Sequence, residues 1–232
     1  MQVAVIGLGR FGAKVAEVLA ARGAEVLAID RDTEICEELK DRVTQSVALD
    51  STDEKSLRAA GVQEMDLAVV AIGANMEASI MTTALLRRLG LERVIARAVT
   101  ALQGAILREV GASEVVFLED QMGEQVALRI VAPQLLERIT LGSGHSLAEL
   151  RPLREFVGKT IRELDLRNRH GVNVIALKRR RPVLTEDGRS AYEVRVNDLP
   201  MPDDRIESDD VLVVVGSREK VDALTKLPGA GD

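Results

Sequence analysis

The sequence predicts an α/β protein: a Rossmann-like, doubly wound parallel sheet of six strands, followed by a small C-terminal α+β lobe. First, the apolar run at residues 3–6 leads directly into Gly7-x-Gly9-x-x-Gly12 and a helical pattern. Second, short apolar runs alternate with amphipathic runs through residue 136, which is typical of β-α units. Third, the pattern changes after the Gly142-Ser143-Gly144 stretch, which indicates a boundary between domains.

The first part of the chain contains six expected strands with helices between them. The strands are expected at residues 3–6, 25–29, 46–49, 67–71, 94–97 and 114–117. The first helix is expected at residues 11–22 and ends at Gly23. Asp53 is a suitable N-cap for a short helix at 54–60, which Gly61 would end. Because parallel crossovers are right-handed, this order predicts helices on both faces of the sheet.

The expected domains are a nucleotide-binding domain at residues 1–120, a connecting segment at 121–140, a C-lobe at 141–227 and a disordered tail at 228–232. The connecting segment is predicted as a helix over 121–138. In the C-lobe we expect helices at 160–166 and 218–227, strands at 172–177 and 210–215, and a polar hairpin-like region between those strands. A lobe of about 80 residues buries limited apolar surface, which favours contact with a partner, most simply a second copy.

Composition excludes several classes of function. The net charge of −6 argues against nucleic-acid binding, and Cys36, the only cysteine, excludes an internal disulfide. The basic run at residues 178–181 is interpreted as a solvated hairpin turn rather than a nucleic-acid or lipid site. Polar residues interrupt the longest apolar stretch, so no membrane span is expected, and action at a membrane would need a partner.

The glycine motif predicts a phosphate-binding loop. Gly7 would permit the tight turn, Gly9 the approach of a phosphate, and Gly12 the close packing of helix on strand. The free N–H groups of the following helix favour an anion there. Asp30, 18 residues after Gly12, is positioned to accept hydrogen bonds from a ribose, which disfavours NADP, although Arg31 weakens that exclusion. The alternative is that Asp30 caps the helix that begins near Asp32.

Further candidate residues follow the other expected strands. Asp50, with Ser51 beside it, could accept from an adenine amino group or could serve helix capping. In the loop at 71–75, Ile72 and Gly73 would flank the crevice and Asn75 could cap the next helix, with a purely structural role for this loop as the alternative. Arg10 inside the glycine loop suggests more phosphate charge than a dinucleotide carries, with a solvated arginine as the alternative. Arg97, at the end of the fifth strand, is a second candidate phosphate contact.

These residues resemble a known family. The run Val5–Gly12, which includes Phe11, the pair Ile29-Asp30, the segment at 71–79, and Glu119 with Met122-Gly123 are similar to RCK proteins, regulators of K⁺ conductance, and most closely to the cytosolic regulatory subunits of Ktr- and Trk-type potassium uptake systems. The resemblance covers nearly the whole chain. It implies an RCK fold with Gly7, Gly9, Arg10, Gly12, Asp30, Asp50 and Arg97 at nucleotide-contacting positions.

The resemblance also implies ligands, partners and a location. ATP or ADP would bind in the N-lobe, with NAD or NADH as further possibilities, and Glu119 would help to hold Mg²⁺, Ca²⁺ or Na⁺ near the terminal phosphate. Homodimers would assemble into an octameric ring. This ring would lie in the cytoplasm at the inner face of the plasma membrane, against a potassium-translocating subunit of the KtrB or TrkH type. The alternative for Glu119 is a first-turn helix acid that the helix dipole favours.

In the C-lobe, many RCK relatives bind cyclic di-AMP between two protomers. The residues at matching positions are Ile161, Leu164, Arg167, Asn173 and Val174. This sequence departs from the family at 166–170, and the alternative is that these five residues serve the core and the surface.

The combined pattern predicts a nucleotide-sensing regulator that is not an enzyme. The competing hypothesis is an NAD-dependent oxidoreductase, which needs a placed acid or base. His145 and His170 are the only histidines, and both fall outside the expected crevice. A redox-sensing repressor would require a DNA-binding helical module, and the sequence shows none.

Overall fold

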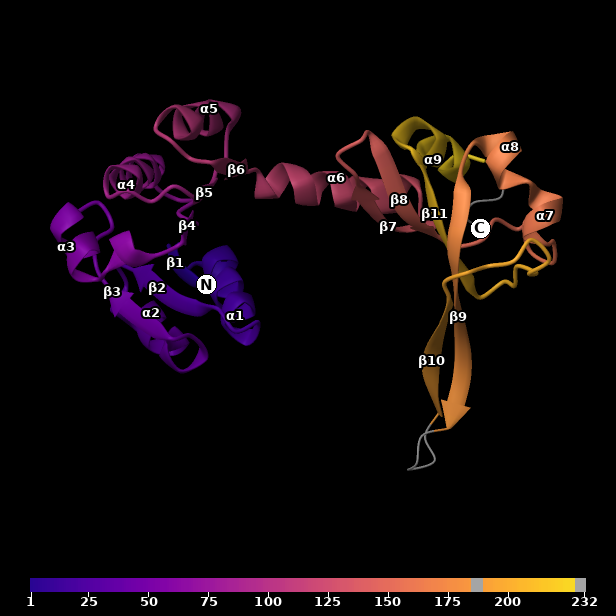
Figure 1. Ribbon diagram of the computed structural model, residues 1–232, viewed down its shortest axis with the longest axis horizontal. Coiled ribbons are helices and arrows are strands. Elements are labelled where there is room, and N and C mark those ends of the chain that lie inside the picture. Colours follow the sequence, from indigo (N-terminus) through magenta and orange to yellow (C-terminus); the bar gives the residue numbers. More distant parts are fainter. Residues whose placement is uncertain (185–189, 228–232) are drawn as a thin grey trace. The chain divides into compact units, whose positions relative to one another are not determined.

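The computed structural model describes residues 1–184 and 190–227, and it divides the chain into two compact units, Met1–Met122 and Gly123–Asp232. Each unit has its own sheet (Figure 1) and its own buried apolar core.

The first unit is built on a six-stranded parallel sheet, as the sequence predicts. Its strand order is β3-β2-β1-β4-β5-β6, so the order reverses direction between β1 and β4. The strands are β1 (Gln2–Ile6), β2 (Glu25–Asp30), β3 (Gln45–Ala48), β4 (Leu67–Val70), β5 (Val94–Arg97) and β6 (Glu114–Val116). In such sheets ligands bind outside the carboxyl ends of the strands, at this switch point.

Helices cover both faces of this sheet, because successive strand residues point to opposite sides. Val3 and Val5 of β1 join one core cluster with Ala16 of α1 and Leu39 of α2. Ala4 and Ile6 join the other cluster, with side chains from α3, α4 and α5. The helices are α1 (Arg10–Ala21), α2 (Thr33–Leu39), α3 (Glu54–Ala59), α4 (Met76–Arg88) and α5 (Ala101–Glu109), with short 3₁₀ turns at Lys40–Arg42 and Val62–Glu64. The doubly wound fold is confirmed.

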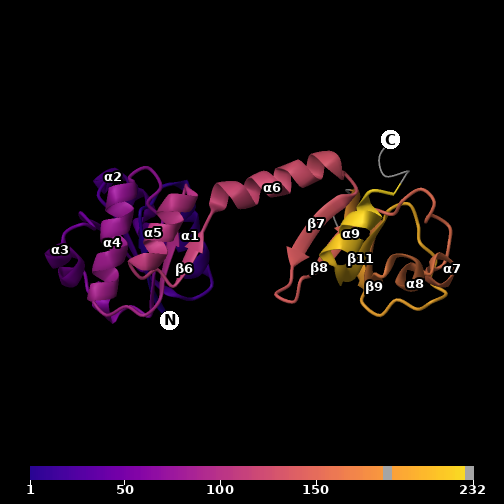
Figure 2. The ribbon, with the colours of Figure 1, turned by 90° about the horizontal axis from the view of Figure 1, so that it is seen from above.

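The second unit is an antiparallel sheet with short helices, in the strand order β10-β9-β11-β8-β7. Helix α6 (Leu118–Val131) leads into it across the boundary between the units (Figure 2). The strands are β7 (Leu135–Thr140), β8 (His145–Leu150), β9 (Asn173–Leu184), β10 (Ser190–Asn197) and β11 (Asp210–Ser217), and the helices are α7 (Ile161–Leu164), α8 (Leu166–His170) and α9 (Arg218–Thr225). Its core includes Leu150, Phe156, Leu212 and Val221.

Two expectations for this region were wrong. The helix expected at 121–138 begins at Leu118 and ends at Val131, because Pro133 follows and the residue before a proline avoids helical geometry. Residues 135–140 form strand β7, paired with β8. The helix expected at 160–166 is divided into α7 and α8 by Asp165, whose φ of 44° is left-handed.

The hairpin-like region is a hairpin of β9 and β10. The basic run lies within strand β9 rather than at the turn, which corrects its interpretation as a turn. The expected disordered tail at 228–232 lies outside the described residues, as does the hairpin tip at 185–189.

Candidate functional site

The glycine loop joins β1 to α1, and two of its glycines are required by close backbone contacts. Gly7 has φ of 90°, and a Cβ there would lie 2.9 Å from Cγ1 of Ile72 and 3.2 Å from the carbonyl carbon of Ala71. A Cβ on Gly12 would lie 1.9 Å from the carbonyl oxygen of Gly7. The turn and the packing of α1 against β1 therefore depend on these glycines.

Gly9 differs, because apart from its chain neighbours no described residue has an atom within 4 Å of the position that its Cβ would take. It stands at the N-cap of α1 with φ of −60° and ψ of −177°, and no side chain caps this helix. By contrast, the helices α2, α3, α4 and α5 are capped by the side chains of Asp32, Asp53, Asn75 and Thr100. The start of α1 thus combines open space with uncapped N–H groups, which is the arrangement that binds anions.

The two side chains after Gly9 lie at this open end. Arg10 is the first residue of α1 and is exposed, so its guanidinium can approach an anion from the solvent side. Phe11 is half-buried.

Asp30 connects the end of β2 to the glycine loop. Its Oδ2 accepts a hydrogen bond of 2.6 Å from the backbone N–H of Leu8, and its Oδ1 accepts one of 3.0 Å from Asp32. The N-cap of α2 is Asp32, which accepts from Glu34 and Ile35, so the alternative that Asp30 caps this helix is excluded. Arg31 is exposed beside it. Each carboxylate oxygen of Asp30 can accept a further hydrogen bond.

Asp50 and Ser51 follow β3 and have different surroundings. Asp50 is exposed, and the Thr52 side-chain hydroxyl, 2.7 Å from Oδ1, lowers the pKa of this carboxyl together with the Thr52 N–H. Ser51 is buried, with its hydroxyl 2.8 Å from that of Thr82 on α4. Sequence reasoning missed the pairing with Thr82, because it joins residues 31 positions apart.

The loop after β4 brings Gly73 against Arg97 of β5. A Cβ on Gly73 would lie 2.5 Å from Nη1 of Arg97, so a larger residue here would require this guanidinium to shift. Ile72 is partly buried against the core and touches Gly7. Asn75 caps α4 as expected, accepting a 3.0 Å hydrogen bond from Ala78.

Arg97 also forms an ion pair with Glu119, in the first turn of α6. The pKa of Glu119 is lowered, first by the hydrogen bond from its own backbone N–H and then by Arg97. Nε of Arg97 is buried and has no hydrogen-bond partner among the residues that the structure describes. Among the described residues, no three His, Cys, Asp or Glu side chains gather as a metal-binding group, so Glu119 would need oxygen ligands from elsewhere to hold a cation.

The predicted residues of the first unit therefore meet at one edge of the sheet. The glycine loop follows β1, Asp30 ends β2, Asp50 follows β3, Gly73 follows β4 and Arg97 ends β5. Because these strands are parallel, their carboxyl ends lie at the same edge. Open backbone donors, cations and carboxylates at this edge suit a ligand that carries both phosphate and ribose.

The five candidate residues of the C-lobe divide between core and surface. Leu164 is buried in the core of the second unit, and Ile161 and Val174 pack against that core. Arg167 and Asn173 are exposed. The apolar members thus serve the core, whereas the two polar members are accessible to a ligand.

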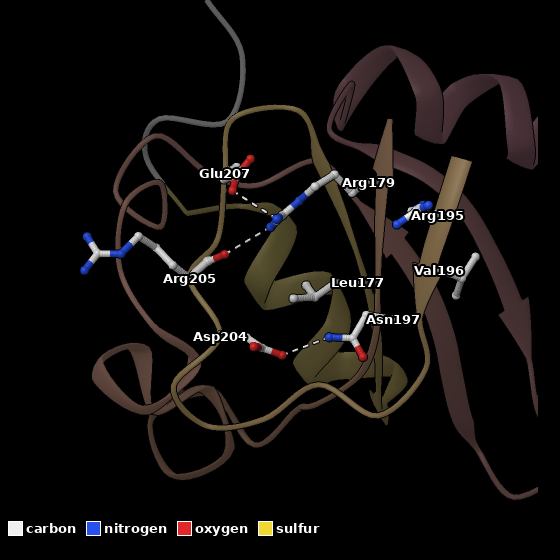
Figure 3. Close-up of a pocket in the computed structure, with 8 residues that line it drawn as sticks. All are labelled: Leu177, Arg179, Arg195, Val196, Asn197, Asp204, Arg205 and Glu207. Atoms are coloured by element: carbon white, nitrogen blue, oxygen red, sulfur yellow. Dashed lines mark hydrogen bonds and ion pairs between the residues drawn. The ribbon is translucent and has the colours of Figure 1, made fainter. Parts of the chain in front are cut away.

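The described part of the second unit also contains a cavity of about 340 Å³ between β9, β10 and the loop that follows β10 (Figure 3). None of the five candidate residues lines it. Its charged groups are already paired: Arg179 with Glu207 and with Asp210 nearby, and Asp204 with the side-chain amide of Asn197. The cavity is therefore no stronger a ligand site than the sequence-predicted positions.

Comparison with known proteins identifies the family. The TrkA-N domain family matches residues 3–118, and the TrkA-C domain family matches residues 146–229. The Ktr system potassium uptake protein C of Bacillus subtilis (strain 168) is 33% identical over 225 residues, which cover 97% of this chain and 96% of the relative. The chain therefore belongs to the family of TrkA-domain proteins that includes the Ktr potassium uptake proteins. The Ktr system potassium uptake protein A of Vibrio alginolyticus is 30% identical, over 95% of this chain and 94% of its own length.

Solved structures agree with this family at the level of the fold. The GsuK channel matches 100% of this TrkA-type chain with a TM-score of 0.66 and 20% identity, and a structure of the GsuK RCK domain matches it with a TM-score of 0.63 and 19% identity. The chain spans 39% and 48% of those two structures, respectively. The RCK fold inferred from the sequence is thereby confirmed. Among the described residues, no helix is long and apolar enough to cross a membrane.

Proposed function

We propose that this chain is a nucleotide-sensing regulatory subunit of a potassium uptake system and that it binds ATP or ADP on the glycine loop. Relatives over nearly the full length are Ktr potassium uptake proteins. The observation that carries the ligand is the open, uncapped start of α1 at Gly9. Fixed N–H groups there would bind a phosphate without the cost of first breaking a side-chain cap.

Each candidate residue has a role in this proposal. Arg10 adds charge beyond what backbone N–H groups supply, and Phe11 and Ile72 provide the apolar surroundings of the loop. Asp30 accepts from the ribose while it keeps its bond to Leu8. Asp50 accepts from the adenine amino group, Arg31 and the backbone at Ser51 border the base, and Gly73 and Asn75 flank the phosphates.

The ion pair of Arg97 and Glu119 would distinguish ATP from ADP through the terminal phosphate. A terminal phosphate would take the Arg97 guanidinium, and the released Glu119 carboxylate would hold Mg²⁺, Ca²⁺ or Na⁺ beside that phosphate. The lowered pKa of Glu119 keeps it anionic, as a hard cation requires. ATP and ADP differ at this point, so they can favour different conformations, which is the condition for any switch.

The proposal includes assembly and location. On α6, Met122, Val126 and Ile130 recur every four residues and are 46%, 52% and 74% exposed. Such an apolar stripe suits the same helix of a second copy. We propose that these homodimers form an octameric ring in the cytoplasm against a membrane-embedded KtrB- or TrkH-like subunit, with no nucleic-acid partner. Exposed Arg167 and Asn173 would receive cyclic di-AMP in the C-lobe.

A nucleotide screen by thermal unfolding tests the proposal. ATP or ADP at 100 times its dissociation constant would stabilise the protein by about 2.7 kcal/mol. Arg10→Ala is expected to reduce this response, whereas Lys14→Ala, an exposed cation one turn further along α1, is not. NAD⁺, NADH and cyclic di-AMP complete the screen, each with and without Mg²⁺ or Ca²⁺. A response to NADH alone would instead favour an oxidoreductase, and equal responses of Arg10→Ala and wild type would reject the role of Arg10.

A further inference from the structure

The hairpin of β9 and β10 extends beyond the sheet to which it belongs. Strand β11 pairs with β9 only as far as Arg179, so residues 180–184 of β9 and the facing part of β10 form a two-stranded ribbon (Figure 1). A ribbon of two strands without a third is marginally stable in water. A third strand paired with the ribbon would add the interstrand hydrogen bonds that this part of the sheet lacks.

The free edge of the ribbon is strand β10, which stands at the end of the sheet order. Among the described residues, its only strand partner is β9. Val194 and Val196 on this strand are 53% and 54% exposed. Edge strands are usually protected by proline, bulges or a covering element, and an exposed edge with β-branched apolar residues favours pairing with another chain.

The charges on β10 favour one register of pairing with a second copy of this strand. Suppose that two copies of one strand pair antiparallel about a two-fold axis. Residues that face each other must point to the same face of the sheet, and side chains alternate between faces along a strand. The axis must therefore pass through a residue rather than between two residues. An axis at Glu193 would face two glutamates, and an axis at Arg195 would face two arginines. An axis at Val194 places Glu193 of each copy opposite Arg195 of the other, twice, and attractive cross-strand pairs stabilise a sheet.

We propose that β10 of one copy pairs antiparallel with β10 of a second copy, centred on Val194, and so joins the two C-lobe sheets into one. Within one copy, Glu193 and Arg195 are 3.7 Å apart with mostly exposed side chains, a contact that contributes little by itself. The pairing between copies gives each of these charges a partner across the strands. It is a separate interface from the α6 stripe and requires no nucleotide.

Disulfide cross-linking of the full-length protein tests the register. Facing residues of antiparallel strands have Cα atoms about 4.5–5.5 Å apart, within the range of about 4.4–6.8 Å that a disulfide spans. Val194→Cys should therefore give a covalent dimer under a mild oxidant such as oxidised glutathione. Val196→Cys, equally exposed, would place its two thiol-bearing residues about 13 Å apart along the strands and should not cross-link. Cys36, the chain's only cysteine, is buried, so the wild type serves as the negative control for cross-linking.

Charge reversal tests the pairing independently. In the Val194→Cys background, Glu193→Arg alone or Arg195→Glu alone would face like charges twice, and the dimer yield should fall about tenfold. A 1:1 mixture of the two single-reversal proteins should recover the yield as heterodimer, and the double reversal should recover it as homodimer. Loss of folding in a single variant could not produce recovery in the mixture.

Three results would overturn the proposal. The first is equal cross-linking of Val194→Cys and Val196→Cys, and the second is no cross-link in either. The third is a mixture that yields no more dimer than its components. If, in addition, Glu193→Arg increased sedimentation with phosphatidylglycerol vesicles, the basic hairpin would belong to an anionic lipid surface instead.

Discussion

Replacement of Gly9 and of Gly12 by alanine should have opposite consequences, although the two glycines lie three residues apart in one loop. Apart from its chain neighbours, a Cβ at Gly9 meets no atom of the described residues within 4 Å, whereas one at Gly12 lies 1.9 Å from the Gly7 carbonyl oxygen. The first glycine is thus available to a ligand, and the second is required by the fold. Alanine at each position separates these two roles.

The magnitudes follow from these contacts. At Gly9, the extended backbone accepts alanine, whose lower unfolded-state entropy stabilises by about 0.4–1 kcal/mol. Alanine is also a poorer N-cap than glycine by a similar amount, so the net change in unfolding free energy should be within about 0.5 kcal/mol. At Gly12 the backbone must move, which should cost about 3 kcal/mol or more. For a unit of this size, that lowers the unfolding midpoint by about 12 °C.

Thermal unfolding with and without ATP measures both effects. Gly9→Ala should unfold at the wild-type temperature but lose binding, because its methyl group occupies the path of the phosphate to the N–H groups. The loss of even one charge-assisted hydrogen bond, worth about 1.5–3 kcal/mol, weakens binding at least about tenfold. The reasoning would be refuted if Gly9→Ala bound ATP as tightly as wild type, or if Gly12→Ala unfolded at the wild-type temperature.

Three further changes test other contacts. Asn75→Ala removes the cap of α4 and should lower the unfolding free energy by about 1 kcal/mol in urea titrations; an unchanged midpoint would mean that the cap contributes nothing. The fold lowers the pKa of Glu119, so the ionised carboxylate stabilises the folded state above its unfolded pKa, and this stabilisation is lost as pH falls through the folded pKa. In Glu119→Gln, the unfolding free energy from urea titrations should therefore depend less on pH below about pH 4.5 than in wild type. The same dependence on pH in both proteins would contradict this. Asp210→Ala leaves Arg179 with only its more exposed partner Glu207 and should cost about 3 kcal/mol, whereas the pair Arg179→Met with Asp210→Leu should cost less. Equal losses would mean that the lost charge pairing does not explain the effect of Asp210→Ala.

Much of the first unit could be predicted from the sequence, because its signals are local. Strand and helix periodicities lie within short windows, and Gly12 and Asp53 act on backbone only a few residues away. The end of α6 was also available locally, since Pro133 marks it. The candidate site follows from the same information, because parallel strands bring their carboxyl ends to one edge whatever the side chains are.

The tertiary structure decided which partners those residues have. Asp30 supports the loop through the Leu8 N–H, 22 positions earlier, Ser51 is turned to Thr82, and Arg97 is held between Gly73 and Glu119. Strands β7 and β10 are specified by pairing with β8 and β9, and the exposed edge at Val194 follows only from the strand order. The sequence by itself determined most elements of the first unit and the glycine loop, because periodicity and turn geometry are properties of neighbouring residues. Burial, ion pairs and free edges depend on residues that only the folded chain brings together.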